Sequence, residues 1–150
     1  MAEPRPVIVL GVEHHHGASI VITDGLLDSS TYRSLRDTVI KTALDEPSAV
    51  IVDVNRLSVA STSAWSVFTS ARWHVSTWPN IPILLICNNI EVSRVIAASG
   101  VTRYVPVYVS REAALDAADR GASAGRLRAR AELPRSDVSV RLGRAGSISG

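Results

Sequence analysis

The amino-acid sequence predicts an α/β fold in which a mixed β-sheet begins with a hairpin and continues through parallel crossovers. Short runs of β-branched and other apolar residues alternate with segments of helical periodicity, which is the pattern of strands connected by helices. The first two apolar runs are separated only by three histidines and a glycine, which predicts the hairpin. The expected order of elements is therefore ββαβαβαβα, with about four helices packed on the sheet.

The hairpin strands are expected over residues 6–13 and 18–24, with Gly17 at the turn. The histidines at positions 14–16 raise the question of a metal site. On a strand the first and third share a face and the second points away, and two imidazoles without a third ligand make a weak site. We interpret them as a polar hairpin end and expect no metal.

The first helix begins near Ser29 or Ser30, with a serine or Asp28 as its N-cap, and Pro47 ends it. Helical spacing connects the apolar positions Tyr32, Leu35, Val39, Ile40 and Ala43. This spacing predicts a helix with one face packed on the sheet.

The middle of the chain repeats the alternation of strand and helix. Residues 49–54 (AVIVDV) are predicted to form a strand covered on both faces, residues 55–61 a loop, and residues 62–77 a second long helix. Trp78-Pro79-Asn80 closes that helix, and residues 81–87 form the next buried strand.

The last third of the chain completes the pattern. A short helix is expected over residues 91–99, followed by a strand over residues 104–109 that Pro106 places at an edge of the sheet. Ser110 can cap a final helix that runs to about Arg120.

Composition excludes several classes of protein. Of the 150 residues, 46% are hydrophobic and 20% charged, which suits one globular domain, with or without a tail, and excludes a wholly disordered chain or a collagen. The single cysteine, Cys87, allows no intrachain disulfide and is interpreted as a core thiol. The longest strongly apolar run is too short to span a bilayer and no signal peptide is recognised, so we expect a cytoplasmic protein.

The net charge of +2 hides an asymmetry between the two ends of the chain. Residues 121–150 carry six arginines against Glu132 and Asp137, a net charge of +4, which leaves −2 for residues 1–120. Hydrophobic periodicity also fades after residue 120, which predicts one domain over residues 1–120 and a flexible, Arg-rich tail over residues 121–150. The body carries no basic footprint, so nucleic-acid binding is not expected.

Three segments resemble one family. Asp53 to Phe68 (DVNRLSVASTSAWSVF) resembles the strand–loop–helix segment of STAS domains, the fold of bacterial anti-sigma factor antagonists. Gly25-Leu26-Leu27-Asp28 resembles the turn before the first long helix of that family, and Asn88 to Leu115 resembles its segment from the fourth main strand to the last helix. The resemblance covers roughly residues 6–120.

The resemblance implies a phospho-acceptor loop. The phosphorylated serine of the family corresponds to Thr62 and the next hydroxyl to Ser63, while Ser61 stands at the position of the family's aspartate. Ala64 replaces the glycine of the family loop, and Trp65 replaces an aliphatic residue. The residues expected to be phosphorylated are, in order, Thr62, Ser63 and Ser61.

The resemblance also implies a partner. That partner would be an anti-sigma factor, a switch kinase of the histidine-kinase-like ATPase fold, which would bring the ATP, so this chain needs no cofactor of its own. A homodimer is the other assembly considered for this chain. The residues expected to contact the partner are Asp28, Ser61, Thr62, Trp65, Ser66, Thr69 and Trp73.

Helical rotation of about 100° per residue divides the expected helix over residues 62–77 into two faces. Ala64, Phe68, Ala71 and Val75 fall on the face toward the sheet. Thr62, Trp65, Ser66, Thr69 and Trp73 fall on the other face. Two outward indoles beside hydroxyls indicate a docking surface, although they can also tuck against a neighbouring helix or the tail.

The hydroxyls at the start of this helix also admit two interpretations. Ser61 or Thr62 can simply cap the helix. Alternatively, a phosphate here would lie beside free backbone N–H groups at the positive end of the helix dipole, and would place charge in the middle of a docking surface.

Three hypotheses of function follow. The first is a binding module that engages an anti-sigma factor, and the second is a scaffold subunit of a larger assembly, such as a stress-signalling particle or a lipid-transport complex. The third is a small flavodoxin-like enzyme, which the absence of a phosphate-binding loop, of a Gly-x-Ser-x-Gly elbow and of clustered acid and base groups argues against.

Overall fold

The computed structural model describes the backbone of residues 8–132 and the side chains of residues 8–121. The chain divides into two units, Met1–Ala118 and Asp119–Gly150, which are described separately. The first unit contains the sheet, three complete helices and the start of a fourth, and the remainder of that fourth helix belongs to the second unit.

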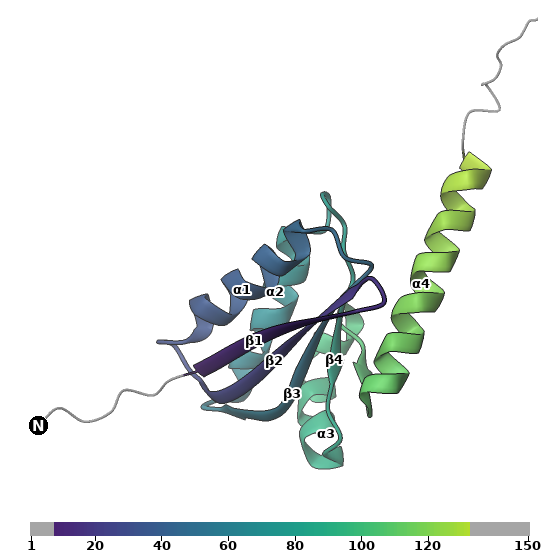
Figure 1. Cartoon of the computed structure of the whole chain (residues 1–150). Helices are drawn as coiled ribbons and strands as arrows, with labels where there is room; N and C mark the ends of the chain where they lie inside the picture. Colours follow the sequence, from purple (N-terminus) through teal and green to yellow (C-terminus); the bar gives the residue numbers. More distant parts are fainter. Residues whose placement is uncertain (1–7, 133–150) are drawn as a thin grey trace, which may run out of the picture. The chain divides into compact units, whose positions relative to one another are not determined.

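Five strands form one sheet, in the order in which they occur in the sequence (Figure 1). β1 (Ile8–His15) and β2 (Ala18–Leu27) are antiparallel. β3 (Val50–Val59), β4 (Ile83–Ile86) and β5 (Val107–Tyr108) then follow in parallel. The predicted mixed sheet with an initial hairpin and parallel crossovers is confirmed, and the last strand lies at an edge as expected.

Helices cover both faces of the sheet. α1 (Tyr32–Leu44), α2 (Ser66–His74) and α3 (Ile90–Ala98) connect successive parallel strands. Right-handed crossovers between strands in consecutive order place all three helices on the same face (Figure 1). α4 (Arg111–Glu132) begins on the opposite face, where two alanines of its first turns are buried.

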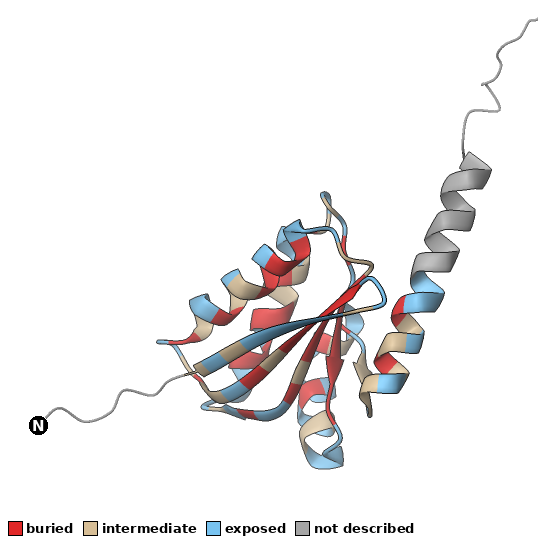
Figure 2. Cartoon of the chain, viewed as in Figure 1, coloured by how far each residue is buried: buried red, intermediate tan, exposed pale blue. Residues whose placement is uncertain are grey.

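The sheet separates two apolar cores of unequal size. Figure 2 colours the buried positions on the strands and helices. The larger core lies under α1, α2 and α3, and its helical members include Leu35, Val39, Phe68, Ala71 and Ile96. The smaller core lies under the start of α4 and comprises Ala18, Ile20, Ala49, Ile51, Leu84, Ile86, Ala114 and Ala118. Strands β2, β3 and β4 are therefore buried on both faces, as their continuous apolar runs predict.

The start of α4 is attached to the sheet by polar contacts as well. Ser110 Oγ accepts a hydrogen bond from the backbone N–H of Ala113 at 3.1 Å, which confirms the predicted cap. The carboxylate of Glu13 on β1 accepts hydrogen bonds from His15 Nε2 at 3.3 Å and from Arg111 Nη1 at 3.0 Å. These two contacts, that of His15 first, hold the pKa of Glu13 below its ordinary value.

The hairpin turn consists of His16 and Gly17, with φ of 50° and 88°. Two consecutive residues with positive φ are the signature of the type I′ turn, whose twist matches that of the strands it joins. The predicted position of the turn at Gly17 is confirmed.

β3 extends beyond the AVIVDV run to Val59. The prediction of a loop from residue 55 was therefore wrong. The cause is a bulge: between the pairs Ile22–Asp53 and Asp24–Arg56, β3 advances by three residues while β2 advances by two. The extra residue shifts the alternation of side chains, so that Leu57 still points into the larger core. A strict period of two therefore ended the predicted strand too early.

Two helix boundaries also differ from the prediction. The helix expected over residues 62–77 is a 3₁₀ turn, η1 (Thr62–Trp65), followed by α2, which ends at His74. α4 continues past Arg120 to Glu132, because alanine and arginine favour helix even where no apolar face is repeated. The rest of the expected flexible tail, residues 133–150, lies outside the described residues.

Candidate functional site

The chain leaves β3 through an exposed loop of hydroxyl residues. Ser61 has extended backbone (φ −149°, ψ 156°), and Thr62 and Ser63 form the first turn of η1. All three side chains are exposed, and Ser61 Oγ lies 2.9 Å from Ser63 Oγ. No side-chain cap is made at the start of η1, so the interpretation of Ser61 as a helix cap was wrong.

The inward face of η1 and α2 was predicted correctly, since Ala64, Phe68, Ala71 and Val75 are all buried. Trp65 was predicted wrongly. Its side chain is only 3% exposed and lies beside the ring of Phe68, with ring centroids 6.1 Å apart.

Trp65 points inward although the helical projection placed it outward. It directly precedes α2, so the three residues per turn of η1 instead of 3.6 rotate it by only about 20°, and residues of β3 and α3 lie beside it. Trp73, which lies within the regular helix, is 60% exposed, as expected. The two indoles therefore do not form one docking surface.

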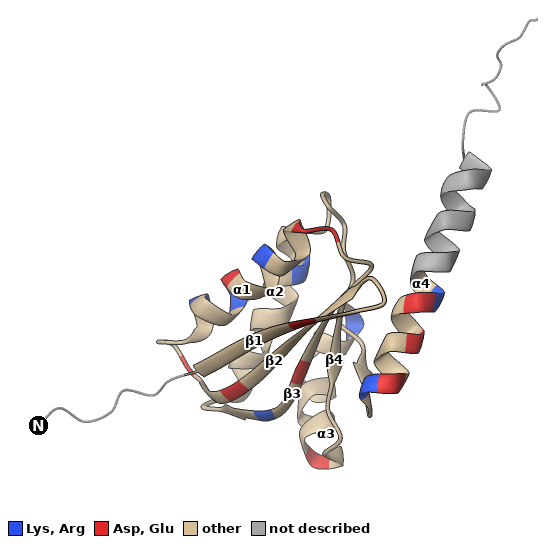
Figure 3. Cartoon of the chain, viewed as in Figure 1, with Lys and Arg blue, Asp and Glu red and all other residues tan. Residues whose placement is uncertain are grey.

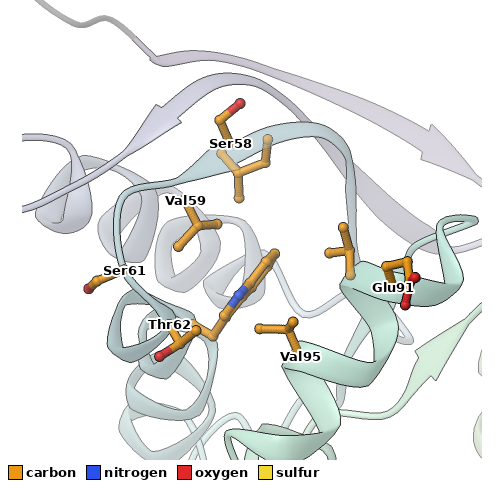
Figure 4. A pocket seen from close by; sticks show the side chains of 9 residues that line it. Ser58, Val59, Ser61, Thr62, Glu91 and Val95 are labelled. Atoms are coloured by element: carbon orange, nitrogen blue, oxygen red, sulfur yellow. The ribbon is translucent and has the colours of Figure 1, made fainter.

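Trp65 instead forms part of the wall of a groove of about 450 Å³ between β3 and α3. In Figure 4, Val59 and Val95 point into this groove from opposite sides, while Ser61, Thr62 and Glu91 lie at its rim. The lining residues are Leu57, Ser58, Val59, Ser61, Thr62, Trp65, Glu91, Val92 and Val95. We call this the loop groove: an apolar floor with exposed hydroxyls along one edge.

A second hollow, of about 550 Å³, lies on the other side of the loop. It brings together Asp28 and Tyr32 at the start of α1 with Ser61, Ser63 and Ser66. The phenol oxygen of Tyr32 lies 3.2 Å from Ser66 Oγ. The turn before α1 and the hydroxyl loop thus line one continuous hollow.

Asp28 is held in place by the turn that precedes α1. Its Oδ1 accepts hydrogen bonds from the hydroxyl and the backbone N–H of Ser30, at 2.6 and 2.8 Å, and from the backbone N–H of Thr31 at 3.1 Å. Thr31 Oγ1 in return accepts from the backbone N–H of Asp28 at 3.0 Å. The bond from the Ser30 hydroxyl, followed by the backbone bonds, lowers the pKa of Asp28. Asp28 is therefore ionised at neutral pH and closes the turn before α1. The N-cap of α1 is Thr31, so the predicted cap at Asp28 or a serine, and the helix start near Ser29 or Ser30, were wrong.

The structure thus brings together most of the residues predicted to contact a partner. Asp28, Ser61 and Ser66 line the second hollow, and Thr62 and Trp65 line the loop groove. Thr69 is half-buried and Trp73 lies near the end of α2, and neither lines these two hollows. The contribution of α3 was missed, since its apposition to β3 is a tertiary contact without a local sequence signal.

Acidic residues are distributed over β1, β2, β3, α1, α3 and α4 rather than gathered at one place (Figure 3). Within the described part of the chain, no three His, Cys, Asp or Glu side chains are placed to hold a metal ion. His14 Nδ1 lies 3.1 Å from Ser19 Oγ, and His15 contacts Glu13. None of the described helices has both the length and the apolar character needed to cross a membrane.

The part of the chain that matches a known protein family is the part that forms the sheet and the helices packed on it. Residues 10–114 match the sequence profile of the STAS domain. The chain belongs to the STAS domain family. The matched region of this STAS domain runs from β1 into the first turn of α4, and it includes both hollows beside the hydroxyl loop. No match was found among curated protein sequences.

Solved structures agree with this STAS fold. An anti-sigma factor antagonist from Mycobacterium paratuberculosis is 21% identical with a TM-score of 0.64, and the alignment covers 75% of this chain and 95% of that one. RsbS of Moorella thermoacetica, in variant form, is 13% identical with a TM-score of 0.59, over 74% and 95% of the two chains. SpoIIAA in its unphosphorylated form is 16% identical with a TM-score of 0.55, over 72% and 94%.

Proposed function

We propose that this STAS domain is a non-catalytic regulatory module of the cytoplasm that binds an anti-sigma factor through the loop groove and the adjoining hydroxyl loop. The observation that carries this proposal is the arrangement of the loop: of its three exposed hydroxyl residues at the start of η1, Ser61 and Thr62 border an apolar groove. Its similarity in fold to an anti-sigma factor antagonist supports the choice of partner.

The loop groove supplies the apolar part of such an interface. Leu57, Val59 and Val95 offer aliphatic surface, and Trp65 supplies a rigid aromatic wall. An apolar side chain of the partner that enters the groove would remove this surface from water, the main favourable contribution to association. Asp28, with its position fixed by the turn, would set the polar edge of the same interface.

Phosphorylation of Thr62 would switch this interface off. A phosphate on this exposed rim residue would add about −1.5 to −2 charges next to an apolar groove, where Glu91 is already negative. The free N–H groups at the start of η1 would tolerate the anion, so the fold would stay intact while the partner is repelled. The partner would be a switch kinase of the histidine-kinase-like ATPase fold, which would supply the nucleotide.

The test compares three variants in affinity purification from a cell lysate and in titration with the anti-sigma factor so identified. Thr62→Glu is expected to weaken binding about tenfold or more, a loss of about 1.4 kcal/mol, with little change in melting temperature. Thr62→Ala should bind as the unmodified protein does. Thr77→Glu, at an exposed threonine outside both hollows, is the matched control and should bind normally.

A scaffold function without a switch is the second candidate. It is favoured by the loop itself, in which Ser61 and Ala64 stand where the family pattern has an aspartate and a glycine. If Thr62→Glu binds as tightly as the wild type, phosphorylation of this residue is not the switch and the scaffold function takes precedence.

A further inference from the structure

A third hollow lies at the far end of α2 and belongs to neither surface described above. It has a volume of about 350 Å³ and is lined by Arg72, Trp73, Ser76, Arg103 and Tyr104. We call it the aromatic cleft. Trp73 lies seven residues beyond Ser66, the first residue of α2, and at a rise of about 1.5 Å per residue this is about 10 Å along the helix axis.

The two aromatic side chains of the cleft are exposed and in contact with each other. Trp73 is 60% and Tyr104 46% exposed, and their ring centroids are 5.5 Å apart with the planes inclined at 53°. The contact between α2 and the end of η2 (Val101–Arg103) thus creates a rigid apolar surface open to solvent. Tryptophan, tyrosine and arginine are the residue types most often found at the energetic centre of protein interfaces.

The charged residues that line the aromatic cleft are both positive. Arg72 and Arg103 flank the rings, and no carboxylate is present among the described residues that line the cleft. Arg72 Nη2 donates to the side-chain oxygen of Asn80 at 3.0 Å, whereas Arg72 Nη1 has no acceptor within the described part of the chain. Nη1 is buried, and buried donors are normally paired, so an acceptor that reached this group would satisfy it.

We propose that the aromatic cleft is a second binding surface, which takes an acidic segment of a partner protein. A carboxylate of the segment would lie between Arg72 and Arg103, and an adjacent apolar side chain would pack on Trp73 and Tyr104. Arginine and carboxylate match in charge and in planar geometry, and the aromatic rings match an apolar neighbour. This inference stands independently of the function proposed for the loop groove, because it uses none of the same residues.

The position of the cleft means that an anion there is held by Arg72 and Arg103, and not by a helix terminus. Trp73 and Ser76 lie at the C-terminal end of α2, where the helix dipole is negative and the backbone presents C=O groups. Phosphate sites use the opposite, N-terminal end of a helix, with its free N–H groups. The hydroxyl of Ser76 donates to the backbone oxygen of Trp73 at 2.8 Å and is thereby already engaged.

The experiment uses the full chain and two blocked tetrapeptides, acetyl-Asp-Phe-Asp-Phe-amide and its neutral analogue acetyl-Asn-Phe-Asn-Phe-amide. Each is titrated while the indole N–H signals are followed by NMR, with the signal of Trp73 assigned from the Trp73→Phe variant. The acidic peptide is expected to shift the Trp73 signal and to bind about fivefold more tightly than the neutral one at low salt, a preference that high salt removes.

Variants locate the site. The double change Arg72→Ala with Arg103→Ala should abolish the preference for the acidic peptide, and Trp73→Ala should weaken both peptides. The double change Arg33→Ala with Arg56→Ala, at exposed arginines outside the cleft, is the matched control for the loss of two charges. Trp78→Ala is the control for the loss of an indole that is 64% exposed. Melting curves check that each variant is folded. If Trp73→Ala does not fold, the double arginine variant alone tests the proposal.

Three outcomes would overturn the proposal. Equal affinity for the two peptides would remove the role of charge. Shifts confined to the indoles of Trp65 or Trp78 would place the peptide elsewhere. A stronger response of the Trp73 signal to ADP than to the acidic peptide would assign the cleft to a nucleotide instead.

Discussion

At the residue scale, the two tryptophans of the helix after β3 have opposite environments and therefore different roles. Trp65 packs on Phe68 and forms part of the wall of the loop groove, whereas Trp73 is exposed in the aromatic cleft. The same residue type therefore contributes mainly to stability at one position and mainly to recognition at the other.

Trp65→Ala is expected to lower the free energy of unfolding by about 3–5 kcal/mol, because a buried indole is lost and a cavity remains. Trp73→Ala, at an exposed position, should change it by less than about 1 kcal/mol. Urea denaturation followed by circular dichroism measures both. Equal losses for the two variants would show that Trp73 is packed as tightly as Trp65.

Because of Asp28, the free energy of unfolding is expected to depend on pH in the acidic range. Hydrogen bonds to its carboxylate depress its pKa below the ordinary value of 3.8, so the stabilisation is complete above that pH and is lost as the pH falls through the lower, folded-state pKa. Asp28→Asn should therefore be less stable than the wild type at pH 6, and the difference should shrink at pH values below 3.8. Urea midpoints across this range test the prediction, and a difference independent of pH would contradict it.

At the element scale, the boundaries of strands and helices depend on individual turn and cap residues. The turn at His16 and Gly17 and the cap at Ser110 were recognised from local chemistry, since each satisfies a requirement within a few residues of sequence. The bulge in β3 was not recognised, because it reveals itself only in the pairing with β2.

Gly17→Ala is expected to destabilise the hairpin by about 1–2 kcal/mol. The φ of 88° lies in the left-handed region, where a Cβ is unfavourable, even though the nearest side-chain atom, Ser48 Oγ, would be 3.8 Å away. The loss therefore comes from backbone strain and not from a clash. Gly121→Ala, at a glycine without positive φ and with open space around it, is the matched control and should not destabilise the protein.

At the scale of the whole molecule, the STAS domain has two apolar cores, and the smaller one depends on the first turns of α4. Ala114 and Ala118 are buried in that core, and Arg111 contacts Glu13 on β1. The start of α4 is therefore part of the domain, even though the rest of the helix, from Asp119, belongs to the second unit.

Deletion of the residues after 121 should leave a cooperatively melting domain, because both cores remain complete. Deletion after Ser110 should abolish cooperative melting or lower the melting temperature strongly, since the cover of the smaller core is removed. Differential scanning calorimetry of the two truncated chains checks this. Loss of cooperativity in the longer chain would mean that the segment after 121 packs as part of the fold.

The sequence by itself determined the order of the elements, the hairpin turn and the inward face of α2, because each depends on periodicity or on turn chemistry within a short stretch of chain. It also placed the hydroxyls of Ser61, Thr62 and Ser63 on the loop between β3 and α2. Only the tertiary structure decided which surfaces these residues form. The packing between elements buried Trp65, the apposition of α3 and β3 formed the loop groove, and the contact of Trp73 on α2 with Tyr104 created the aromatic cleft. Such surfaces join residues far apart in the sequence, and their geometry follows from packing between elements, which no local pattern contains.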